Sequence, residues 1–455
     1  MKTVIIGGGI SGLAAAYYLS SQQPGRQVVL LESSSRFGGI IRTQQQDGFC
    51  LEAGPDAFVR QKKEAAELCR ELGLESDLIP NRIENQVSYS WIEGKMHPFP
   101  RVLNPPIELH EIVGSPLLSA LGRQRASCEP GIPPGSGQDE SVASFMGRRF
   151  GTEVVQRVFE PLVAGIFGAS ASEISLPAAF PRILQYEQQH GRLTSPRAGE
   201  LGLSAQESTE SIFQSLRKGM EQIPAKLVEA LQQRAELHLG SRVRSIRRAA
   251  GGFEVQLDRG PSIMADSAVL ATSAPQAAQL LHGGLGPIAD LLGRIEYAAS
   301  ILVCLGYREE VVDRPGSGWI APPDSGKALL ACSWAHQKFA HRCPAGHSLL
   351  RAYLGGTSAS RLLKADDRQI LQTVRQELHD IQGVTARPVL ERVYRLPRAL
   401  PLYKLGHLDL VSRIEESLRQ VPGLFCIGNY LDGVGIPACL GQAQSVAAWL
   451  AESAE

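Results

Sequence analysis

The chain has 455 residues, more than one compact core usually holds, so we expect two or three domains, one of which can be assembled from separated segments. Its 46 Lys and Arg residues balance 46 Asp and Glu residues, and the formal net charge of zero removes any global electrostatic argument for a nucleic-acid partner. The 8 cysteines form no Cys-x-x-Cys pair, so their spacing predicts neither a zinc site nor a disulfide framework.

The N-terminus, the hydropathy pattern and the cysteines indicate the compartment in which we expect the protein. Met1-Lys2 leads directly into an apolar strand, without the basic segment and cleavage site of an export signal. No uninterrupted apolar stretch reaches about 18 residues, so we expect no membrane-spanning helix. Cysteines without a disulfide pattern fit a reducing compartment. The sequence therefore predicts a cytoplasmic protein, and peripheral contact with the inner membrane stays open.

The first predicted elements are a strand, a helix and a strand. Thr3 to Ile6 is a short apolar run, Ser11 to Ser21 repeats small and apolar residues with a helical period, and Gln27 to Leu31 is a second buried strand. Pro24-Gly25 ends the helix between them. Together they make a βαβ unit of about 30 residues. This unit predicts a Rossmann-like domain in a protein of the α/β class.

A glycine motif lies where the first strand meets the helix. Gly7-x-Gly9-x-x-Gly12 supplies a tight turn, a close approach for a pyrophosphate and close packing of helix on strand. Glu32 ends the second strand, where a carboxylate accepts hydrogen bonds from ribose hydroxyls and disfavours the 2′-phosphate of NADP. An isolated match is often only a glycine-rich turn, but here the flanking strands and the acidic residue support a dinucleotide site. The predicted contacts are Gly7, Gly8, Gly9, Ile10, Ser11, Gly12, Glu32 and Ser33.

A second glycine pair indicates which of the two dinucleotides, NAD or FAD, the site binds. Arg36-Phe37-Gly38-Gly39 follows Glu32 closely, and adjacent glycines let another backbone segment approach the cofactor where the longer FAD continues. Taken alone, the segment could be an ordinary loop after a strand. Together with the first motif it favours FAD, with Gly38 and Gly39 as further contacts.

The rest of the chain alternates between helical and strand patterns. A Gly, Pro and Ser-rich stretch from Cys128 to Gly137 predicts a mobile loop within a mainly helical middle region. Helices are predicted at Gly219 to Gln233, Asp367 to Ile381 and Pro437 to Ala451. A strand meander is predicted at Arg242 to Arg248, Phe253 to Asp258 and Ser262 to Ala271. Further strands are predicted at Tyr297 to Tyr307, Ala328 to Ser333, Leu349 to Leu354, Pro388 to Tyr394 and Leu424 to Ile427.

These elements predict a division into three parts. Residues 1–80, 215–275 and 395–455 should join into one FAD-binding domain. Residues 276–394 should form a mixed-sheet domain that binds the substrate, and residues 91–214 a helical subdomain that walls the substrate cleft.

Several segments resemble the amine-oxidase-like flavoproteins, and among them the protoporphyrinogen and coproporphyrinogen oxidases. The resemblance covers nearly the whole chain. Its first motifs are Glu32-x-x-x-Arg36-x-Gly38-Gly39-x-x-Arg42 and Leu51-Glu52-Ala53-Gly54-Pro55-Asp56-Ala57-Phe58. Pro161 to Phe167 and Ser175 to Pro181 are similar to stretches typical of the porphyrinogen oxidases rather than of amine oxidases generally. The late motifs are Arg398-Ala399-Leu400-Pro401-x-Tyr403-x-x-Gly406-His407-Leu408 and Gly433-Val434-Gly435-Ile436-Pro437-x-Cys439.

The resemblance implies a site and an activity. The implied FAD contacts are Gly54, Pro55, Asp56, Ala57, Val243, Val434, Gly435 and Ile436. The implied reaction is the oxidation of a porphyrinogen in haem biosynthesis, with molecular oxygen as the electron acceptor; protoporphyrinogen IX is favoured and coproporphyrinogen III is the alternative. Contact with a ferrochelatase stays open.

The same resemblance also has departures. Leu402 stands where the family usually has glutamine, Ala438 where aspartate is usual, and Gly168 to Ala171 where Ala-Gly-Asp-Pro is common. Because these departures lie in family motifs, a non-catalytic FAD-bearing porphyrin carrier stays open. The other alternative is another amine-oxidase-like flavoenzyme, such as an amine oxidase or a carotenoid desaturase, against which the motifs from Pro161 to Pro181 and from Arg398 to Leu408 argue.

The predicted chemistry needs few protein side chains. Because a flavin accepts the hydride, we expect no catalytic nucleophile or acid–base pair and no metal. An apolar slot should hold the macrocycle, with cations for its propionates. Arg60 and Arg101 are the candidates, although a solvated surface position is the more common reason for an arginine.

Overall fold

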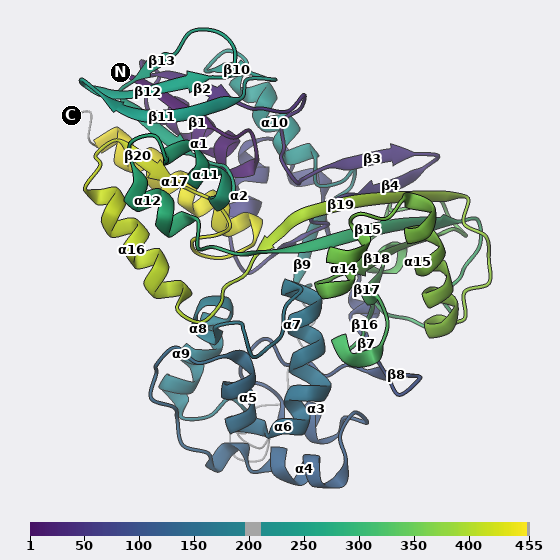
Figure 1. Ribbon diagram of the computed structural model, residues 1–455. Coiled ribbons are helices and arrows are strands. Elements are labelled where there is room, and N and C mark those ends of the chain that lie inside the picture. The colour runs from purple at the N-terminus through teal and green to yellow at the C-terminus, as the bar shows by residue number, and fades with distance from the viewer. Residues whose placement is uncertain (196–210, 453–455) are drawn as a thin grey trace.

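The computed structural model describes residues 1–195 and 211–452. Figure 1 shows three regions: a sheet covered by helices near the N-terminus, a second sheet with long strands, and a group of helices below both. Residues 196–210 of the predicted helical subdomain and 453–455 of the predicted third FAD-domain segment lie outside the described residues. Among the helices that are described, none is long and apolar enough to cross a membrane.

The first sheet is parallel and draws on three separated parts of the chain. Its order is β10 (Glu236–His238), β2 (Gln27–Leu31), β1 (Lys2–Ile6), β14 (Ser267–Leu270) and β20 (Leu424–Cys426). The central strands are buried on both faces, as parallel strands covered by helices usually are. This sheet confirms the predicted α/β class and the Rossmann-like start of the chain.

Each face of the parallel sheet has its own core. On one face Ile5, Leu30 and Val269 pack against α1 (Ile10–Gln22), α2 (Glu64–Glu71), α10 (Gln222–Leu231) and α17 (Ile436–Glu452). On the other, Val4, Leu31 and Leu270 pack under α11 (Ala274–Leu281), α12 (Gly286–Leu292), α16 (His407–Arg419) and a strand meander. The sheet is thus the middle layer of three (Figure 1).

The meander corrects one predicted strand. Its strands are β11 (Val243–Ala249), β12 (Gly252–Leu257) and β13 (Ile263–Ala265). The single strand expected from Ser262 to Ala271 is wrong, because the chain leaves the meander after Ala265 and continues as β14 in the parallel sheet. The two parts differ in environment, since β14 is buried throughout while β13 is only partly buried.

The second sheet is mixed. Its order is β19 (Leu390–Pro401), β15 (Tyr297–Tyr307), β18 (Ser348–Leu354), β17 (Leu329–Trp334), β16 (Gly318–Ile320), β7 (Ser88–Ile92) and β8 (Lys95–Pro98). The amphipathic helix α15 (Asp367–Gln382) buries Ile370, Val374 and Leu378 in the core of this sheet. A mixed sheet is confirmed. It is extended by β7 and β8, and the residues of these strands from Trp91 onwards belong to the range that we expected to be helical, 91–214.

The third region is mainly helical and surrounds a core that includes Phe145, Met146 and Phe159. Its α-helices are α3 (Leu109–Val113), α4 (Ala120–Ser127), α5 (Val142–Phe150), α6 (Thr152–Val154), α7 (Glu160–Phe167), α8 (Leu176–Ala179) and α9 (Pro181–His190). Smaller elements connect the regions: β3 (Thr43–Gln46), β4 (Phe49–Glu52), β5 (Phe58–Val59), β6 (Leu78–Pro80), β9 (Phe213–Leu216), α13 (Ala335–Lys338) and α14 (Gly356–Leu362). The division into three functional domains remains our proposal.

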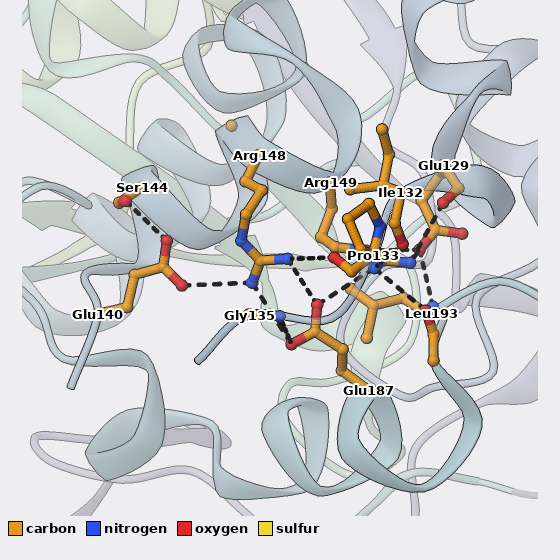
Figure 2. Close-up of polar contacts among 12 residues, drawn as sticks. Glu129, Ile132, Pro133, Gly135, Glu140, Ser144, Arg148, Arg149, Glu187 and Leu193 are labelled. Atoms are coloured by element: carbon orange, nitrogen blue, oxygen red, sulfur yellow. Dashed lines mark hydrogen bonds and ion pairs between the residues drawn. The ribbon is translucent and has the colours of Figure 1, made fainter. Parts of the chain in front are cut away.

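The segment expected to be a mobile loop is anchored at its start. Glu129 and Arg149 have no solvent-exposed side-chain surface and form an ion pair, drawn in Figure 2. The Glu129 carboxylate also accepts hydrogen bonds from the backbone N–H of Leu193 at 2.8 Å and from the Thr194 hydroxyl at 2.5 Å. Arg149 donates a further bond to the Ile132 carbonyl at 2.8 Å. These contacts tie the segment to α5 and to the chain after α9.

Candidate active site

One continuous cavity of about 1220 Å³ lies between the two sheets. Its floor is formed by residues that directly follow the strands of the parallel sheet, such as Gly7 after β1, Glu32 after β2 and Ala271 after β14. Ligands of open α/β sheets bind at this carboxyl edge. The opposite wall comes from α7 and from strands β15, β18 and β19.

The structure brings nearly all predicted cofactor contacts together at this cavity. The predicted residues that line it are Gly7, Gly9, Ile10, Ser11, Glu32, Ser33, Gly38, Gly39, Gly54, Pro55, Asp56, Ala57, Val243, Val434, Gly435 and Ile436. Gly8 and Gly12 are not among the described lining residues, although each directly follows a residue that is. These residues come from five separated stretches of chain, and the fold alone makes them neighbours.

The glycine loop is shaped for a close ligand. A Cβ atom on Gly12 would lie 1.9 Å from the carbonyl oxygen of Gly7, so only glycine lets α1 begin directly against the turn. α1 begins after Gly9 with no side-chain cap, so its first N–H groups are left for an anion. A pyrophosphate fits this position, because the positive end of the helix dipole stabilises its charge.

Glu32 has a second role that the sequence did not reveal. One carboxylate oxygen accepts a hydrogen bond from the backbone N–H of Gly8 at 2.7 Å, and the other accepts one from the N–H of Ser34 at 2.7 Å. The oxygen that faces Gly8 has a further lone pair for a ribose hydroxyl, while the other also accepts a long hydrogen bond from the Ser33 hydroxyl at 3.4 Å. Glu32 therefore braces the glycine loop and lines the cavity with the same carboxylate.

The second glycine pair is held in place by Arg36. Its guanidinium donates hydrogen bonds to the carbonyl oxygens of Phe37 at 2.9 Å and Ile41 at 3.2 Å, and also to that of Gly39. Gly39 has φ +58°, and a Cβ atom at this position would lie 3.1 Å from the Cα of Gly9. The two glycine segments therefore touch, and Arg36 is a structural clamp rather than a ligand.

Asp56 lies in a buried ion cluster that sequence reasoning missed. Its carboxylate is 2.8 Å from Arg351 of β18 and 3.1 Å from Lys338 of α13. Burial alone would raise the pKa of the Asp56 carboxyl, but the two cations lower this pKa well below its usual range. Arg351 also donates hydrogen bonds to the carbonyl oxygens of Glu52 at 3.1 Å and Gly54 at 2.6 Å. The cluster fastens the Gly54–Ala57 lining segment to the mixed sheet.

The other half of the cavity is an apolar slot. It is walled by Ala164 to Gly168 at the end of α7, by Leu302 of β15 and Leu330 of β17, and by Tyr353 to Gly355 at the end of β18. Burial raises the pKa of the Tyr353 phenol, so the phenol stays neutral. A flat, mostly apolar ligand with polar edges suits such a slot.

The predicted substrate cations lie elsewhere. Arg60 and Arg101 are both exposed, and neither is among the described residues that line the cavity. The backbone N–H of Arg60 bonds the carbonyl of Ile212 at 2.9 Å. The cavity is lined instead by two other cations outside the dinucleotide cradle, Lys62 and Arg398. Over residues 1–195 and 211–452, no group of three or more His, Cys, Asp or Glu side chains is placed to hold a metal ion.

Comparisons with known proteins identify the family. The family model described as flavin containing amine oxidoreductase matches residues 10–450. Coproporphyrinogen III oxidase of Bacillus subtilis (strain 168) is 32% identical over 97% of this chain and 96% of its own. The chloroplastic protoporphyrinogen oxidase of Nicotiana tabacum is 27% identical over 98% of this chain and 85% of its own.

Solved structures agree with this grouping. A crystal structure from Exiguobacterium sp. 255-15 is 30% identical, covers 99% of both chains and gives a TM-score of 0.87. Cyclohexylamine oxidase from Brevibacterium oxydans shares the fold, with a TM-score of 0.72 at 18% identity. The chain therefore belongs to the flavin-containing amine oxidoreductases, in the group of FAD-dependent enzymes named coproporphyrinogen and protoporphyrinogen oxidases.

Proposed function

We propose that this enzyme oxidises coproporphyrinogen III to coproporphyrin III in haem biosynthesis, with molecular oxygen as the electron acceptor. The observation that carries the proposal is the single cavity, which joins a glycine-rich dinucleotide cradle to an apolar slot. A substrate in the slot would lie against whatever occupies the inner end of the cradle. That arrangement suits direct hydride transfer from a large flat molecule.

The choice of coproporphyrinogen III departs from our expectation of protoporphyrinogen IX. Similarity to the Bacillus and Staphylococcus aureus coproporphyrinogen III oxidases supports the change, at 32% and 27% identity. Coproporphyrinogen III carries two propionates where protoporphyrinogen IX carries vinyl groups. The cations Lys62 and Arg398 at the cavity suit the more highly charged substrate.

FAD, when bound, supplies the hydride acceptor, and each two-electron round removes a hydride from a bridging carbon and a proton from a pyrrole nitrogen. The protein has to bind, orient and shield the substrate. With a substrate in place, the apolar walls from α7, β15 and β18 would exclude water from the slot. The N-terminus of α17 at Ile436 lies on the cavity, and its dipole favours negative charge on a group bound there.

Anaerobic mixing of the holoenzyme with each porphyrinogen tests the proposal. Coproporphyrinogen III should bleach the flavin absorbance at least tenfold faster than protoporphyrinogen IX, which corresponds to about 1.4 kcal/mol of transition-state discrimination. Readmitting air should restore the colour and release hydrogen peroxide. A tenfold preference for protoporphyrinogen IX would reverse the substrate assignment. Porphyrin binding without bleaching by either substrate would instead identify a carrier, and bleaching by an amine or a carotenoid another flavoenzyme of the family.

A further inference from the structure

Arg398 lies at an irregular point of the long edge strand β19. Tyr297 and Ala298 of β15 pair with Pro401 and Leu400, but Ser300 pairs with Leu396. Residues 397–399 therefore stand opposite the single residue 299, and the strand bulges around Arg398. A β-bulge redirects side chains and is common beside active sites. Both strands line the cavity along this stretch.

Arg398 differs from its two neighbouring arginines on β19. Arg392 donates a hydrogen bond to Gln46 at 2.5 Å, and Arg395 forms an ion pair with Asp367 at 2.5 Å. Arg398 lines the cavity, its surface is exposed, and it forms no hydrogen bond or ion pair with any residue that the structure describes. An unpaired guanidinium on a mostly apolar cavity favours a ligand that carries an anionic group.

The position of Arg398 argues for the substrate rather than the cofactor. The dinucleotide phosphates have their own site at the N-terminus of α1, on the parallel sheet. Arg398 belongs to the mixed sheet, between Leu396 and Leu400, which also line the cavity.

We propose that Arg398 binds a propionate carboxylate of the substrate and thereby favours coproporphyrinogen III over porphyrinogens with fewer carboxylates. The inference rests on the proposed function and names the group that selects the substrate. A guanidinium presents two parallel N–H donors to a carboxylate, so the pair is directional as well as electrostatic. Loss of this contact should weaken binding without changing the hydride-transfer step itself.

The test measures binding of coproporphyrin III and of its uncharged tetramethyl ester to the FAD-loaded enzyme by porphyrin fluorescence. Arg398→Gln should weaken binding of coproporphyrin III about tenfold or more and leave binding of the ester unchanged. Arg398→Lys should retain part of the affinity, because it keeps the charge but not the paired donors. Arg387→Gln is the matched control, since Arg387 is exposed, has no described ion pair and does not line the cavity.

Flavin reduction supplies the second measurement. Arg398→Gln should raise KM for coproporphyrinogen III about tenfold and leave kcat within about twofold, with unchanged FAD content. The role of Arg398 would be overturned if the wild type and Arg398→Gln bound coproporphyrin III equally well. It would also be overturned if the variant lost as much affinity for the ester as for coproporphyrin III. Either result would leave the proposed function intact. Loss of FAD from the variant would also overturn it, by assigning Arg398 to the cofactor. A wild type that is reduced by neither porphyrinogen would refute the proposed function itself.

Discussion

The guanidinium of Arg351 lies 2.8 Å from the carboxylate of Asp56, although the two residues come from different regions of the fold and are almost 300 positions apart. Only 1% of the Arg351 side chain and 15% of the Asp56 side chain is exposed. Lys338 completes the cluster from a third element. This contact joins the Gly54–Ala57 lining segment to the mixed sheet that walls the apolar slot, so the relative position of the two depends on it.

Asp56→Asn should therefore destabilise the protein. The change leaves the charges of Arg351 and Lys338 buried without their partner, which costs about 3–5 kcal/mol at neutral pH. Denaturant unfolding of the holoenzyme, followed by circular dichroism and flavin fluorescence, measures the loss. Asp313→Asn is the control, because 78% of the Asp313 side chain is exposed in its pair with Arg314, and it should cost less than about 1 kcal/mol. Equal effects of the two changes would contradict the importance of the buried cluster.

The low pKa of Asp56 also predicts a pH dependence. A carboxyl whose folded-state pKa lies below its ordinary value of 3.8 adds stability above that value, and this contribution is lost as the pH falls through the folded-state pKa. The stability difference between the wild type and Asp56→Asn should therefore be constant at neutral pH and narrow as the pH falls below 3.8. Unfolding midpoints measured across this range check the prediction; a difference that widened towards low pH would contradict it.

Glu129→Gln should destabilise the helical region. The substitution keeps the shape of the side chain but removes the charge that Arg149 faces in a fully buried site (Figure 2). Arg149 retains Glu187 at 3.2 Å, so we expect a loss of about 3 kcal/mol, at the lower end for a broken buried pair. Glu93→Gln is the control, since 73% of its side chain is exposed in the pair with Arg157. Thermal unfolding compares the two variants, and similar midpoints would argue against a stabilising role of the network.

The sequence predicted those strands, helices and motifs whose signal lies within one short stretch of the chain. Tyr297 to Tyr307 is the strand that its apolar run predicts, and Asp367 to Ile381 differs from α15 by one residue. The glycine motif and Glu32 predicted the dinucleotide cradle because the spacing of glycines is itself the structural requirement. The motifs of the family also located the Gly433–Pro437 lining of the cavity.

Features that depend on distant partners were not predictable. The Asp56–Lys338 hydrogen bond spans 282 positions, and nothing in either local sequence indicates the pairing. β19 continues past the predicted end at Tyr394, although Pro397 and Pro401 argue against a strand. Proline is tolerated there because β19 is an edge strand with a bulge. The bulge that places Arg398 on the cavity could not be predicted either, because it depends on how β19 pairs with the distant strand β15.

Gly12→Ala should abolish FAD binding. The new Cβ would lie 1.9 Å from the Gly7 carbonyl oxygen, so α1 must move away from the turn that holds the phosphates. Gly25→Ala is the matched control, because a Cβ atom on Gly25 would have no other atom within 4 Å. The ratio of flavin absorbance to protein absorbance after purification measures the outcome. Normal flavin content in Gly12→Ala would contradict the assigned role of the loop.

Glu32→Ala should weaken FAD retention without preventing folding. The variant loses the ribose hydrogen bonds that we assign to Glu32, at about 1.5–3 kcal/mol for a charged acceptor, and it also frees the N–H groups of Gly8 and Ser34. Titration of the apoprotein with FAD should therefore give a dissociation constant at least tenfold higher than that of the wild type. Glu236→Ala is the control, because Glu236 lies on the neighbouring strand β10, is exposed and does not line the cavity.

Glu32→Gln separates the two roles of this residue. The amide oxygen can still accept one hydrogen bond from the loop, but the side chain no longer offers two charged oxygens to the ribose. The amide NH2 group would face the other backbone N–H, donor to donor, so we expect the apoprotein unfolding midpoint to fall below that of the wild type and the FAD affinity to fall between those of the wild type and Glu32→Ala. If Glu32→Gln and Glu32→Ala lowered apoprotein stability equally and left FAD affinity unchanged, Glu32 would serve only to brace the loop, and the ribose contact would be wrong.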